Sequence, residues 1–104
     1  MIVVTTNEVA GKTIKETIGI VKGEIVQSKH FGRDFMAGMK NLVGGEIVGY
    51  TEMISDARRI ATERMIKQAE ELGADAIVDV RYGSSTVMQG AAEMIAYGTA
   101  VKFK

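Results

Sequence analysis

Residues 52–72 constrain the fold of this chain more than any other segment, because their apolar side chains repeat at helical spacing. At about 100° per residue, one half of the helical wheel holds all the large apolar side chains but one. The apolar residues in this half are Met53, Ile54, Ala57, Ile60, Ala61, Met65, Ala69 and Leu72. Charged side chains occupy the opposite side, and Gly73 stands where a left-handed residue ends a helix. The segment therefore predicts a long amphipathic helix that packs on one other layer.

Segments rich in β-branched residues lie on both sides of this helix and predict the layer that it covers. The expected strands are residues 1–6, 13–28, 76–82 and 93–103. Gly19 and Gly23 interrupt the second of them, where we expect a bulge or the close approach of another backbone. Residues 88–91 are predicted to form the tip of a hairpin between the last two strands.

The stretch between residues 30 and 46 has its own apolar spacing. Phe31, Phe35 and Met39 follow one another at intervals of four, and Leu42 extends the stripe. This spacing favours a short helix that ends at a Gly-Gly pair, followed by a brief strand over residues 47–50.

These elements predict a two-layer α+β fold in which the long helix packs on an antiparallel sheet. The chain has 104 residues, fewer than the roughly 150 per domain that serve as a prior, so we expect one domain over residues 1–104. The last strand would span about 36 Å and the helix about 30 Å. The two can therefore lie against each other along their whole lengths.

The last predicted strand has two unequal faces, and neither is polar enough to be left in water. Bulky side chains from Ile95 to Phe103 form one face, and the other is mostly small. A small face suggests that a second surface packs closely on it, and a neighbouring subunit is its simplest source.

Ile66 on the helix gives a second indication of association, because it lies outside the apolar half, whereas Arg64 and Gln68 lie inside it. Either Arg64 extends its charge to water and Ile66 is simply exposed, or Ile66 contacts another subunit.

Composition excludes several classes of function. Thirteen Lys and Arg balance thirteen Asp and Glu, so no broad basic field would attract nucleic acid or an anionic membrane. The absence of cysteine excludes disulfides, thiolate metal sites and a cysteine nucleophile. No apolar run approaches the roughly 18 residues of a membrane span, and no signal peptide is evident. A cytoplasmic location is therefore the default expectation.

Candidate metal ligands are few. His30, the single histidine, and Asp34 stand four residues apart, which would place both on one side of a helix. Without cysteine, a divalent metal would need carboxylates as its main ligands. The alternative is a surface histidine followed by an aspartate at a helix start.

Basic residues close to the Gly-Gly pair suggest an anion pocket. Its basic residues would be Arg33, Lys40, Arg58 and Arg59, which flank the pair in sequence. Arg33, Asp34 and Arg58 are the candidate ligand-binding residues, and a solvated charged surface is the alternative interpretation. A hydrolase-like enzyme using Arg33 and Asp34 is a third hypothesis, but the sequence offers it no activated nucleophile.

Several short strings along the chain resemble those of the YbjQ-like family. They are Gly32-Arg33-Asp34, Ala37-Gly38-Met39-Lys40-Asn41, Gly44-Gly45-Glu46, Tyr50, Arg58-Arg59-Ile60-Ala61, Gly73-Ala74-Asp75-Ala76-Ile77-Val78 and Ala96-Tyr97-Gly98-Thr99-Ala100-Val101. The resemblance implies a dodecin-like subunit, a helix on an antiparallel sheet, that assembles into a closed ring, in this family a pentamer. It also implies heavy-metal binding, which a chain without cysteine and with one histidine supports poorly.

We therefore expect a non-enzymatic, ring-forming homo-oligomer that binds a small ligand or a partner at subunit junctions. The alternative function is metal binding or handling through His30, Asp34 and carboxylates of neighbouring subunits.

Overall fold

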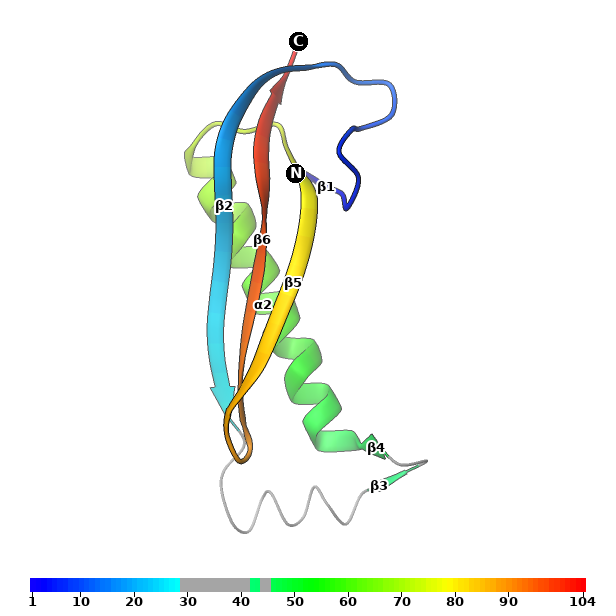
Figure 1. The fold of residues 1–104 in the computed structure, drawn as a ribbon, viewed down its shortest axis with the longest axis vertical. Coiled ribbons are helices and arrows are strands. Elements are labelled where there is room, and N and C mark those ends of the chain that lie inside the picture. Colours follow the sequence, from blue (N-terminus) through cyan, green and yellow to red (C-terminus); the bar gives the residue numbers. More distant parts are fainter. Residues whose placement is uncertain (29–41, 44–45) are drawn as a thin grey trace.

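The computed structural model describes residues 1–28, 42–43 and 46–104, which form one helix and two sheets. In chain order the elements are β1 (Ile2–Val3), β2 (Ile14–Ser28), β3 (Leu42–Val43), β4 (Glu46–Ile47), α2 (Val48–Glu71), β5 (Ala76–Met88) and β6 (Ala91–Phe103). Figure 1 shows α2 lying obliquely across one face of a four-stranded sheet of order β1-β5-β6-β2. β3 and β4 form a separate two-stranded sheet. The predicted α+β fold, with a helix packed on a sheet, is confirmed.

The sheet is mixed, so the prediction of a purely antiparallel sheet is wrong. β1 pairs parallel to β5 through Ile2 with Ala76 and Val3 with Ile77. The N-terminal segment continues along the same edge, where the Val80 N–H donates to the Val4 carbonyl at 3.0 Å. The chain then reaches β2 at the opposite edge, and no local pattern in the sequence specifies this crossing.

The boundaries of the elements differ most around the start of α2. The helix begins at Val48, so the strand predicted for residues 47–50 is wrong beyond Ile47. The wrongly predicted part, residues 48–50, is too short for periodicity to separate a strand from a helix. The short helix predicted for residues 30–46 lies mostly outside the described residues, and Leu42, its last apolar position, belongs to β3.

α2 ends as the sequence predicts. Gly73 has a φ of +75°, its N–H donates to the Glu70 carbonyl at 3.0 Å, and the Ala74 N–H donates to the Ala69 carbonyl at 3.0 Å. These two bonds are the pair that defines a Schellman motif. In the part of the chain that the structure describes, no helix is both long and apolar enough to cross a membrane.

The small face of β6 packs on the helix of its own chain. Ala96 and Ala100 are fully buried in one cluster with Ala57, Ala61 and Met65 of α2. Small residues on both layers allow the helix to lie close to the sheet and to form many short contacts. The close partner that we expected for this face is therefore α2, not a neighbouring subunit.

Gly23 is the point of closest approach between the helix and the sheet. A Cβ atom at Gly23 would collide with the Ala61 carbonyl oxygen and the Met65 amide nitrogen, and would lie 2.8 Å from Arg64 Cβ. The other predicted glycine, Gly19, stands at a register shift of β2 with a φ of +144°. Both glycine expectations, a bulge and a close backbone approach, are confirmed.

The two polar residues on the apolar side of the helix, Arg64 and Gln68, form hydrogen bonds with the backbone at the edge of β2. Arg64 Nη1 donates to the Glu24 carbonyl at 2.6 Å, and Gln68 Oε1 accepts from the Lys22 N–H at 2.7 Å. These bonds satisfy edge groups that would otherwise be open to pairing with another strand. Ile66 is half-buried against the core cluster of its own chain, so it is less exposed than the helical wheel predicts. A contact of Ile66 with another subunit stays a prediction.

We predict that Gly23→Ala lowers the free energy of unfolding by about 2–3 kcal/mol, because the colliding atoms belong to the helix backbone and cannot rotate away. Urea unfolding followed by circular dichroism measures this. Gly83→Ala is the matched control, since its Cβ would meet only the Ile95 Cγ2 at 3.2 Å. A Gly23→Ala variant as stable as the Gly83→Ala variant would contradict this packing.

Candidate functional site

The face of the sheet opposite α2 exposes apolar side chains. We call it the bulky face and define it by Ile20, Lys22, Glu24, Val26, Arg81, Ile95, Tyr97 and Thr99. Ile20 is 81% exposed, Val26 60% and Tyr97 42%. A monomeric soluble protein seldom shows such side chains together without a partner for them.

Charged groups cross the middle of the bulky face. Lys22 and Arg81 stand directly opposite Tyr97 on its two neighbouring strands. Lys22 Nζ lies 2.9 Å from Glu24 Oε1, and this hydrogen bond, followed by the charge of Glu24, raises the pKa of Lys22. Arg81 Nη1 donates to the carbonyls of Thr5 and Val80, both at 2.9 Å. The bulky face is therefore a mixed surface, with apolar side chains above and below a band of charge.

A pair of hydroxyl groups joins α2 to β5 on the other face of the sheet. Thr62 Oγ1 lies 2.9 Å from Tyr82 Oη and donates to the Arg58 carbonyl at 2.7 Å. Arg58 is exposed one turn before Thr62. Sequence reasoning selected Arg58 but not Thr62 or Tyr82, because a contact between a helix and a strand depends on the register of the sheet.

Of the predicted site residues, the structure describes Arg58 alone. His30, Arg33 and Asp34 lie outside the described residues. Whether they approach Arg58 or one another stays a prediction. Within residues 1–28, 42–43 and 46–104, no three histidine, aspartate or glutamate side chains come together as a metal ion would require.

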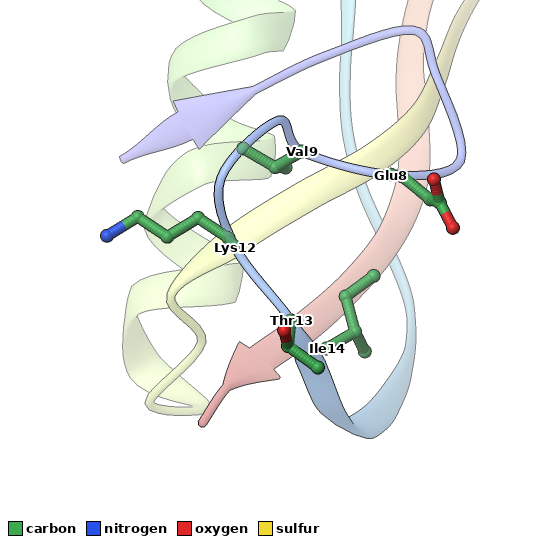
Figure 2. A pocket seen from close by; sticks show the side chains of 5 residues that line it. All are labelled: Glu8, Val9, Lys12, Thr13 and Ile14. Atoms are coloured by element: carbon green, nitrogen blue, oxygen red, sulfur yellow. The ribbon is translucent and has the colours of Figure 1, made fainter.

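The N-terminal loop surrounds a hollow of about 300 Å³ (Figure 2), lined by Glu8, Val9, Lys12, Thr13 and Ile14. The side chains of Glu8 and Lys12 point away from each other in this view. Lys12 Nζ lies 5.9 Å from the centroid of the Phe103 ring, within range of a cation–π contact. The two charged side chains therefore do not converge on the hollow. A ligand in it would meet no pair of charged groups.

A family model described as "Putative heavy-metal-binding", YbjQ_1, matches residues 1–104. The chain belongs to the YbjQ family. This confirms the resemblance found in the sequence. The description concerns the family, and the described residues contain no cluster of metal ligands that would fit it.

Two bacterial relatives cover the whole chain. The UPF0145 protein of Thermotoga maritima is 60% identical over 104 residues and matches over 100% of this chain and 98% of its own length. The UPF0145 protein of Colwellia psychrerythraea is 55% identical over 104 residues, with 100% and 99% covered. Neither name assigns a chemical activity.

A solved structure shares the fold. It is the crystal structure of a protein of unknown function of the DUF74 family from Pediococcus pentosaceus, with a TM-score of 0.63 and 20% sequence identity. The similarity covers 100% of this chain and 98% of that chain. At this identity, the similarity concerns the fold alone.

Proposed function

We propose that this YbjQ-family chain is a non-enzymatic building block that associates with copies of itself through the bulky face. The observation that carries the proposal is the exposure of Ile20, Val26 and Tyr97 on the face opposite α2. Among the described residues, the N-terminal segment covers only the end of this face at Ala76, Val78 and Val101. Burying this apolar area against a second copy would be favourable at about 25 cal/mol per Å². The charged band would fix the orientation of the two copies, because unpaired charges in a wrong register are costly.

The dimensions of the chain support this proposal. It exposes 6574 Å² of surface, compared with about 5,700 Å² for a compact protein of this mass. Its radius of gyration is 16.9 Å, compared with about 13 Å for a compact chain of this length. A thin, elongated protomer leaves more surface to be covered by association.

For the form of the assembly, we propose a closed ring of five dodecin-like subunits, as the resemblance to the family implies. A head-to-tail contact between identical chains closes into a ring when its rotation fits. Junctions between subunits would then be the place for a small ligand or a partner.

Native mass spectrometry at micromolar concentration tests association. We predict one assembled species, which for five copies of the 11.2 kDa chain has a mass of about 56 kDa. A species of 11.2 kDa alone would contradict the proposal.

The same measurement on two variants tests the bulky face. Ile20→Glu should shift the population to single chains, because the carboxylate would be buried without a partner. Leu72→Glu is the matched control, since Leu72 is 47% exposed just beyond the end of α2 and is not part of the bulky face. An Ile20→Glu variant that keeps the same assembled mass as the Leu72→Glu variant would exclude the bulky face as the contact.

Metal handling is the second candidate function, and the family description is the finding that favours it. Its proposed ligands are His30, Asp34 and carboxylates of neighbouring subunits. Neutral imidazole and carboxylates can bind Zn²⁺, Cu²⁺ or Ni²⁺ without thiolates. The ligand set would have to be completed outside the described residues or by another copy.

Calorimetric titration with Zn²⁺, Cu²⁺ and Ni²⁺ tests this function. We predict binding that weakens at least tenfold in His30→Ala, because imidazole is the strongest donor that this chain offers these metals. Unchanged heats for His30→Ala would remove His30 from the site, and no heat for the wild-type chain would contradict metal handling altogether.

A further inference from the structure

The helix leaves half of β5 open on the side that it covers elsewhere. Beyond Val80, the helix-side residues of β5 are Tyr82, Ser84 and Thr86, and all three are exposed. Their cross-strand partners on β6, namely Ala96, Met94 and Ala92, are 0–3% exposed. The open part of β5 carries a hydroxyl group at each of these three positions.

The neighbouring side of α2 is polar as well. Thr51, Ser55, Arg58 and Thr62 fall within about 60° of one another on the helical wheel. The bond between Thr62 and Tyr82 fixes this side as the one that faces β5. None of the four is acidic, and the acidic side chains of the same helix lie about 80° or more from Thr62. We call Arg58, Thr62, Tyr82, Ser84 and Thr86 the hydroxyl surface.

Counting protons fixes the direction of the bond between Thr62 and Tyr82. The single hydroxyl proton of Thr62 goes to the Arg58 carbonyl, which can only accept. Tyr82 therefore donates its own proton to Thr62 Oγ1. The Tyr82 oxygen keeps its lone pairs free, so toward solvent it acts as a hydrogen-bond acceptor.

Arg58 supplies the charge of this surface. Among the described residues its guanidinium has no hydrogen-bond or ion-pair partner, whereas that of the adjacent Arg59 pairs with Glu63 at 3.1 Å. A guanidinium that no described residue pairs, on a surface whose five defining residues include no carboxylate, suits a phosphate group, to which it can donate two hydrogen bonds.

We propose that the hydroxyl surface binds a small organic phosphate that carries a hydroxyl group. The phosphate pairs with the Arg58 guanidinium, and the hydroxyl of the ligand donates to the free lone pair of Tyr82. Ser84 and Thr86 offer further hydroxyl groups along the same strand. All these residues belong to one chain, so this inference goes beyond the proposed association and does not depend on it.

Titration of the full-length, ¹⁵N-labelled protein with glycerol 3-phosphate, followed by TROSY NMR, tests the proposal. We expect saturable shifts at the amides of residues 82–86 and 58–62. Arg58→Gln should weaken binding at least tenfold, because it removes the charge that pairs with the phosphate. Arg59→Gln is the matched control and should leave the affinity unchanged. No saturable shift in the wild type, or equal losses in both variants, would overturn the proposal.

The hydroxyl contact is tested separately with Tyr82→Phe and with propyl phosphate, which lacks the hydroxyls. Tyr82→Phe should weaken glycerol 3-phosphate binding about fivefold and leave propyl phosphate binding unchanged. Propyl phosphate is the control, because it keeps the phosphate that pairs with Arg58 and lacks the hydroxyl that would donate to Tyr82. Equal effects on both phosphates, or no effect of Tyr82→Phe, would overturn the proposal. Native mass spectrometry of Arg58→Gln and Tyr82→Phe is the control for association. Masses equal to that of the wild type show that a lost affinity reflects ligand binding and not a change in assembly.

Discussion

The contact between the backbone of α2 and Gly23 of β2 is the constraint on which the rest of the structure depends. Because Gly23 has no side chain, the helix can lie almost directly on the strand at Ala61 and Met65. Arg64 and Gln68 then come within hydrogen-bonding distance of the edge of β2. One contact thus sets the depth of the core and lets two helix side chains occupy hydrogen-bonding groups at the edge of β2.

This placement of the helix also decides what it leaves open. A helix seated over β2 and β6 cannot cover the far half of β5, so Tyr82 stays exposed beside Thr62. It covers one face only, which leaves Tyr97 and its apolar neighbours on the other. The two open surfaces differ in chemistry: the bulky face suits a second copy of the chain, and the hydroxyl surface suits a polar ligand.

Much of the fold could be predicted from periodicity and glycines, since these are local signals. The long helix, its end at Gly73 and the role of Gly23 follow from the sequence. The parallel pairing of β1 and the partner of the small face depend on how distant segments meet, which local spacing does not encode. The same holds for the site. Arg58 could be selected as one of the basic residues near the Gly-Gly pair, whereas Tyr82 reaches the helix only through a sheet whose register shifts near Asp79.

The central claim, that the bulky face is covered by another copy and the helix side of β5 is not, can be measured on two tyrosines of one protein. In this chain alone Tyr97 and Tyr82 are nearly equally exposed, at 42% and 44%. Hydroxyl-radical footprinting of the full-length protein, read by mass spectrometry, compares their rates of oxidation. We predict that Tyr97 is oxidised several-fold more slowly than Tyr82. Equal rates would contradict the claim and would mean that the bulky face is open to water in solution.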